Sequence, residues 1–315
     1  MKKIFFLVAL AAVGLAACAT EDTIVTPQGQ AIAFGDAFVD NSTKAIIASA
    51  GDIQGFKVFG NVIATADVAT GTPVPLYTDT GADVTRGDAL LGAAWSCGVT
   101  RYWTPSCTFN FAAVANGSVA AVVEGLPTVI SYEAGTDNDL IYAIADATTE
   151  ADCTPSIATG IVPFSFKHLL SKVGFTISTD LGNGYTAVIT SIAVENVIKN
   201  GTYTINTTNN TITNGTWAAV GTNTVETALE FKDSASHLII PVEQDLTVTI
   251  TYNIQFNGTT LSSGLTKTGD VSHAFAANTV YNITGTLDAL KPIKFTVTEQ
   301  NGLGAWTEGG NVSVQ

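Results

Sequence analysis

The stretch Val162–Ile177, VPFSFKHLLSKVGFTI, has the pattern that most restricts the fold. Its alternate positions form two sets that are one residue out of phase: Phe164, Phe166, His168 and Leu170, then Val173, Phe175 and Ile177. A period of two is typical of a β-strand with one buried face, and a one-residue slip would turn the second set outward. We expect a bulge or a short corner at Ser171 and Lys172 to keep both sets on a single core. The stretch is then the first strand of a second β domain, after the polar linker 148–160.

The clearest strand pattern is Leu246–Phe256, where every even position is apolar or aromatic and the odd positions carry Thr, Asn or Gln. The 315 residues are 46% hydrophobic and only 13% charged. Solvent-facing helices usually need Lys and Glu, whereas β-branched side chains favour strands. The sequence therefore predicts an all-β protein.

The N-terminus predicts an exported lipoprotein. Met1–Lys3 is a basic start, Ile4–Val13 is an apolar run too short to span a bilayer, and the run ends in Leu15-Ala16-Ala17-Cys18. This ending resembles a bacterial lipobox, which implies cleavage before Cys18 and acylation (palmitate among the acyl groups) of that residue. Glu21 and Asp22 resemble a surface-export signal, so we expect an outer-membrane lipoprotein at the cell surface. The alternative is an ordinary secretory signal followed by a chance cysteine.

The charge balance excludes one class of partner. The formal net charge is −14, and removing the signal with its two lysines makes it −16. Such a surface repels phosphate backbones, so we expect no nucleic-acid binding.

A first strand is predicted between the signal and the first domain. Ile32, Phe34 and Phe38 alternate, and the polar segment behind them ends at Lys44, the only basic residue between the signal and Lys57. The predicted division is a signal peptide (1–17), a tether with the first strand (18–44), an N-terminal β-sandwich (45–160) and a C-terminal β-sandwich (161–315).

An aromatic block has two interpretations. It comprises Trp95, Tyr102, Trp103, Phe109 and Phe111. Exposed rings could stack on sugars, but Phe109 and Phe111 alternate with Asn110 and Ala112 as core residues do, so we favour a sandwich core. Cys97 and Cys107 flank part of this block and could form a disulfide outside the cytoplasm, with Cys153 left over.

No pattern indicates catalysis, a metal or a cofactor. The GxSxG, HExxH, P-loop and GxGxxG patterns are absent, and Asp137-Asn138-Asp139 lacks the glycine and glutamate of a calcium loop. His168, within a strand pattern and far in sequence from the other histidines, is interpreted as a hydrogen-bonded structural residue. The tripeptide Arg86-Gly87-Asp88 could mimic an adhesion ligand, although a Gly-Asp after Arg is also an ordinary turn.

Several segments in order resemble the fimbrillin-like proteins of Bacteroidetes. They are the lipobox, Thr43-Lys44-Ala45 ahead of GFKVFG, the W…RYW…FNFAA block, DNDLIYA, VPFSFKHLLSKVGFTI, HLIIPVEQDLTVTITY, ANTVYNITGTL and IKFTV…W. The resemblance implies two tandem transthyretin-like β-sandwich domains and a subunit of a type V pilus. It also implies that a protease cuts between Lys44 and Ala45, removes the first strand, and leaves a groove for a strand of another pilin subunit.

We therefore expect a non-enzymatic pilin, in a stalk, tip, accessory or anchor position, that polymerises by donor-strand exchange for adhesion to a host or bacterial surface. The alternative is a monomeric glycan-binding surface lipoprotein that uses Trp95, Tyr102 and Trp103. Burial of these rings separates the two hypotheses.

Overall fold

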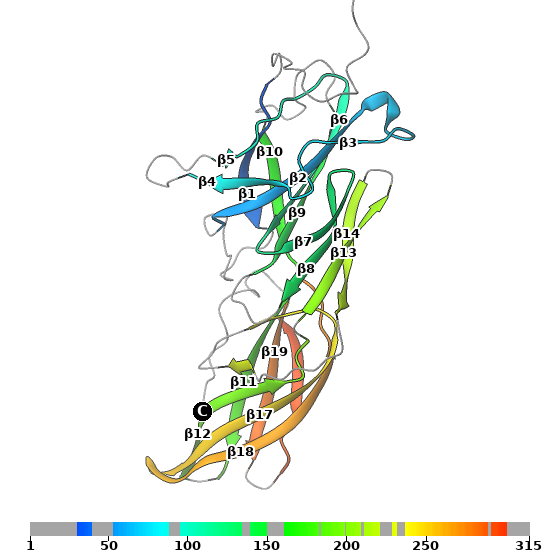
Figure 1. Cartoon of the computed structure of the whole chain (residues 1–315). Coiled ribbons are helices and arrows are strands. Elements are labelled where there is room, and N and C mark those ends of the chain that lie inside the picture. Colours follow the sequence, from blue (N-terminus) through cyan, green and yellow to red (C-terminus); the bar gives the residue numbers. More distant parts are fainter. Residues whose placement is uncertain are drawn as a thin grey trace, which may run out of the picture.

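The structure, a computed structural model, is built almost entirely of strands (Figure 1). It describes residues 30–39, 53–87, 95–133, 139–149, 161–182, 184–198, 200–208, 211–220, 229–231, 237–288 and 291–300. Within these ranges the one helical element is the short 3-10 turn η1, Thr65–Asp67, and no helix has the length and hydropathy needed to cross a membrane. The all-β sandwich prediction is confirmed, whereas the count of two tandem domains stays a prediction.

The first sheet has the strand order β1-β10-β9-β6-β2-β4-β5, with β3 paired to β2. Its strands are β1 (Ala33–Val39), β2 (Gly55–Ala64), β3 (Val74–Pro75), β4 (Ala82–Arg86), β5 (Trp95–Cys97), β6 (Cys107–Ala115), β9 (Ile141–Thr149) and β10 (Ile161–His168). Alternation explains why its middle strands are buried on both faces. Phe109 and Phe111 of β6 enter an N-terminal core, whereas Ala112 and Val114 enter a middle core.

A second sheet joins residues from both halves of the chain. Its order is β14-β13-β8-β7, from β7 (Ser118–Val123), β8 (Leu126–Glu133), β13 (Asn200–Thr208) and β14 (Thr211–Ala219). The two hairpins meet where β13 pairs antiparallel with β8. Tyr203 of β13 and Ile130 of β8 are buried in the middle core, so this core contains side chains from both halves.

The C-terminal part is a sandwich of two four-stranded sheets. One has the order β16-β11-β19-β20 and the other β15-β12-β17-β18. Their strands are β11 (Ser171–Asp180), β12 (Tyr185–Glu195), β15 (Leu229–Phe231), β16 (His237–Ile239), β17 (Glu243–Phe256), β18 (Thr259–Ala274), β19 (Thr279–Asp288) and β20 (Phe295–Gln300). The predicted strand Leu246–Phe256 is confirmed within β17, whose even positions, such as Val248 and Ile250, enter the C-terminal core.

The expectation of one core for Val162–Ile177 is wrong. Val162, Phe164 and Phe166 lie in β10, which pairs with β9 and β1 and packs in the N-terminal core. The second alternating set lies in β11 and packs in the C-terminal core. Leu169 and Leu170 connect the strands and are buried in the middle core. The phase slip arises because the chain crosses from one core to another and needs no bulge. The predicted boundary at 160/161 therefore leaves β10 packed with the N-terminal half.

His168 has the structural role expected of it. Its Nδ1 lies 2.5 Å from Oδ2 of Asp139, and both side chains are buried at the end of β10. The backbone carbonyl of Asp139 accepts a hydrogen bond from Asn116. This pair fixes the start of β9 against the end of β10, next to the point where the chain enters the middle core.

Candidate functional site

The site is the aromatic groove in which β1 lies. β1 is the terminal strand of the first sheet and pairs in parallel with β10, with Phe34 opposite Val162. The segment just before it is held on its other side by residues 101–103. The N–H of Ile32 donates to the carbonyl of Arg101, and the N–H of Trp103 donates to the carbonyl of Gln30. This strand region is therefore fixed between β10 and the β5–β6 connection.

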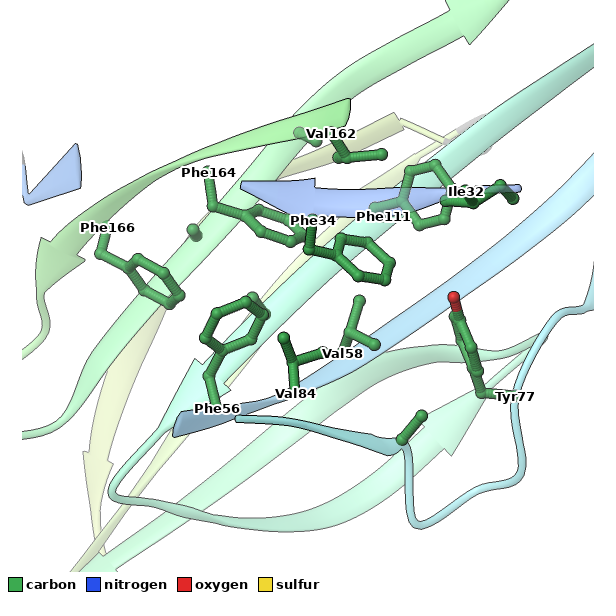
Figure 2. Close-up of a cluster of buried hydrophobic side chains, with 14 of the residues drawn as sticks. Ile32, Phe34, Phe56, Val58, Tyr77, Val84, Phe111, Val162, Phe164 and Phe166 are labelled. Atoms are coloured by element: carbon green, nitrogen blue, oxygen red, sulfur yellow. The ribbon is translucent and has the colours of Figure 1, made fainter. Parts of the chain in front are cut away.

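The side chains of this strand fill an apolar core. Ile32 is 6% exposed and Phe34 is 5% exposed. The Phe34 ring stacks on Phe164 with 5.8 Å between centroids and meets Phe111 edge-on at 5.9 Å (Figure 2). Burying one such side chain contributes about 1.5–3 kcal/mol, and ring pairs add about 0.5–1.5 kcal/mol. If β1 left, Phe111 and Phe164 would line an open groove.

Phe38 also lies in β1, opposite Ser165, after an irregularity in the register between Gly35 and Phe38. Its side chain is outside the described set, so its burial stays a prediction. Cys18, Lys44 and Ala45 lie outside the described residues, and their predicted acylation and cleavage stay predictions.

Tyr77 is a groove residue that the sequence did not reveal. It is 5% exposed, and its hydroxyl has no hydrogen-bond partner among the described residues. In Figure 2 the ring rises from the β3–β4 loop with the hydroxyl directed toward the segment that carries Ile32, just before β1. Burial raises the pKa of Tyr77, while Arg101, whose guanidinium carbon is 5.8 Å from the ring centroid, acts in the opposite direction. No sequence pattern in the loop could have indicated this placement.

The aromatic block is largely part of the N-terminal core. Trp103 is 2% exposed and meets Phe109 edge-on at 4.9 Å. Trp95 is half-buried, 5.2 Å from the Phe56 ring. Of the three rings that a sugar site would need, Tyr102 alone is exposed. The burial pattern favours the core interpretation.

The tripeptide Arg86-Gly87-Asp88 is only partly described, because Asp88 lies outside the described residues. Arg86 ends β4, is half-buried and lies 6.0 Å from the Trp95 ring centroid. Gly87 is exposed. The guanidinium therefore packs on an aromatic ring of its own domain, and the adhesion role stays a prediction.

The register does not bring Cys97 and Cys107 together. Cys97 pairs with Val84, which pairs with Phe56, whereas Cys107 pairs with Ala64 at the other end of β2. Eight residues of an extended strand span roughly 26 Å. Both are thiols in this structure, and Sγ of Cys97 donates to the carbonyl of Val99. Burial raises the pKa of the Cys97 thiol. A Cys97–Cys107 disulfide stays a prediction that this register does not support.

Among the described residues, no three His, Cys, Asp or Glu side chains are grouped as metal ligands would be. The structural features define an all-β sandwich protein whose terminal strand region fills an aromatic groove of the first sheet. The sequence profile of the fimbrillin-like family matches residues 49–300, so the chain belongs to that family of fimbrial structural proteins.

Two solved structures are similar in fold. A fimbrial protein of Bacteroides vulgatus has 15% identity and a TM-score of 0.56, over 86% of this chain and 99% of its own. A proposed cell adhesion protein of Bacteroides uniformis has 19% identity and a TM-score of 0.53, over 89% of this chain and 100% of its own. No curated protein matches the sequence.

Proposed function

We propose that the chain is a structural subunit of a type V pilus, exported as a lipoprotein acylated at Cys18 and matured by cleavage after Lys44. Membership of the fimbrillin-like family supports the coarser part of this proposal, a cell-surface pilus or adhesion subunit. The finer part rests on the predicted signal and on the groove of β1.

The burial of Phe34 between Phe164 and Phe111 carries the proposal. Cleavage after Lys44 frees a segment that ends five residues beyond β1. Its departure exposes the groove rings and leaves backbone groups of β10 and residues 101–103 without strand partners. Unpaired buried backbone groups and exposed apolar surface are both unfavourable, so the emptied groove favours a strand from another subunit.

Assembly by strand exchange makes a filament. The donor segment and the groove are different surfaces, so the contact is head-to-tail and does not close on itself. A subunit that keeps β1 has a filled groove, so it terminates the filament and serves as an anchor. Processed subunits serve in the stalk, at the tip or as accessories.

The alternative function, a monomeric glycan-binding lipoprotein, needs several exposed rings at one place. Trp103 is buried and Trp95 packs on Phe56, so Tyr102 is the one exposed ring of the three proposed for glycan binding. No described contact favours it over the pilin.

Intact-mass and N-terminal analysis of protein sheared from cells tests the proposal. We expect a chain that begins at Ala45, together with a ladder of polymers. Lys44→Ala should abolish the ladder and leave the acylated precursor. Lys57→Ala is the matched control, because among the described residues the Lys57 side chain makes only an exposed ion pair, with Asp83. A ladder that persists in Lys44→Ala would show that processing occurs elsewhere.

A further inference from the structure

The first half of β18 is an open sheet edge. β18 is terminal in its sheet, and among the described strands it pairs only with β17. Its second half is covered: Lys267 Nζ donates to the carbonyls of Asp288 and Lys291, and a Cβ on Gly269 would come within 3.0 Å of the Ile293 carbonyl. In its first half, every residue from Thr259 to Gly264 is exposed. Backbone N–H and C=O groups that point away from β17 are therefore available there for another strand.

Apolar side chains gather at the same end of the sheet. Leu261 is 59% exposed, the most of any large hydrophobic side chain described. Tyr185 and Phe256, which are paired across β12 and β17 with ring centroids 4.9 Å apart, are 46% and 40% exposed. Adjacent exposed apolar side chains beside an open edge are typical of a surface that binds another protein.

The strand segments around this edge carry no charged side chain, although the molecule is strongly acidic. Residues 181–194 and 246–266 contain no Asp, Glu, Lys or Arg, in a chain with a net charge of −14. Two acidic molecules repel one another, and the repulsion is smallest where neither presents a charged side chain. A basic partner would find no carboxylate in these stretches. The chemistry of the surface therefore fits a second copy of the same chain.

We propose that the Thr259–Thr266 edge of β18 pairs antiparallel with the same edge of a second copy, across a two-fold axis. The two sheets then form one continuous sheet, and the exposed Leu261 side chains of both copies are buried at the joint. An isologous contact of this kind closes on itself, so it links chains side by side and adds nothing to a head-to-tail polymer. The edge lies at the opposite end of the molecule from β1 (Figure 1). In a pilus, the contact would join neighbouring filaments.

Analytical ultracentrifugation of the purified chain with β1 still in place tests the inference. A concentration series up to about 1 mM would populate even a weak dimer. We expect a monomer–dimer equilibrium, and hydrogen exchange of the Thr259–Thr266 amides that slows as the dimer forms. Leu261→Glu should weaken the dimer roughly tenfold or more, because each dimer loses two buried leucines and gains two like charges.

Val123→Glu is the matched control, because Val123 is similarly exposed (56%) but lies in β7. It adds the same charge and should leave the dimer constant nearly unchanged. A chain that stays monomeric throughout the series would overturn the inference, as would a Leu261→Glu dimer as strong as the wild type. Slowed exchange at this edge without dimer formation would also overturn it, since the edge would then be covered by its own chain. Because β1 stays in place, none of these results depends on strand exchange.

Discussion

At the scale of single residues, Phe34 joins β1 to the groove through ring contacts with Phe111 and Phe164. Phe34→Ala should lower the free energy of unfolding by about 3–5 kcal/mol, because it removes a buried ring and leaves a cavity between Phe111 and Phe164. Urea unfolding followed by tryptophan fluorescence measures the change. Tyr102→Ala is the control, since Tyr102 lies beside the same strand but is 39% exposed, and we expect under about 1 kcal/mol for it. Equal losses in the two variants would contradict the packing described here.

Tyr77 is the opposite case, a buried group whose hydroxyl weakens the fold with β1 in place. Leaving a hydroxyl buried without a partner costs about 1–3 kcal/mol. Tyr77→Phe removes the hydroxyl and keeps the ring against the groove, so it should leave the stability of the chain with β1 in place unchanged or raise it by up to about 1 kcal/mol. The urea midpoint with β1 in place measures this. A clear loss of stability would mean that the hydroxyl has a partner in solution.

At the scale of elements, the β7–β8 hairpin is fixed on the first sheet by a buried amide pair. Nδ2 of Asn61 donates to the carbonyl of Glu124 in the hairpin turn, and its Oδ1 accepts from Nδ2 of Asn110, both at 2.9 Å. At the next turn residue, Gly125, φ is +77°, and a Cβ would come within 2.6 Å of the Gly60 carbonyl. Polar recognition and close approach together set where the hairpin lies on β2.

Asn61→Leu should therefore lower the free energy of unfolding by about 2–4 kcal/mol, because the amide of Asn110 and the carbonyl of Glu124 both lose their hydrogen bond to Asn61. Chemical denaturation measures this change in the free energy of unfolding. Thr80→Ala, which removes an exposed hydroxyl bonded to Thr78, should change the stability by less than about 0.5 kcal/mol. The double variant Asn61→Leu with Asn110→Leu should cost less than the sum of the single changes, since each removes the partner of the other. Strict additivity would argue against the pair.

The elements also show what the sequence could predict. Alternation predicted the strand in β17 and the strands that became β10 and β11, because the period of two depends only on which face is buried. It also selected Ile32 and Phe34, which are buried. Alternation contains no information about which strand lies alongside, so neither the packing of β10 in the N-terminal core nor the β8–β13 pairing could be predicted. The groove was predicted only in part. Its strand was predicted, but the placement of Tyr77, Arg101 and β10 around that strand depends on contacts between residues that are distant in sequence.

At the scale of the whole molecule, the middle core joins the two halves. Tyr142 of β9 and Tyr203 of β13 meet there with ring centroids 6.3 Å apart, and the indole N–H of Trp217 donates to the carbonyl of Leu169. Side chains from both sides of residue 160 share this core, so loss of packing on one side exposes apolar surface on the other. We infer that the halves unfold together, in a single transition.

The middle core gives a prediction about alkaline pH. Burial raises the pKa of Tyr142 above its ordinary value of 10.0, and the nearby Tyr203 raises it further. The unfolded chain releases this proton near pH 10 while the folded chain retains it, so stability is fully present below pH 10 and falls as the pH rises above it, by up to about 1.4 kcal/mol per pH unit for one such group. Urea midpoints at pH 8, 10 and 11 measure the slope.

Tyr142→Phe keeps the ring, removes a hydroxyl that has no hydrogen-bond partner among the described residues, and should make the slope shallower. An unchanged slope in this variant would mean that the hydroxyl reaches water in the folded chain, and that the middle core is looser than the contacts between β9 and β13 imply.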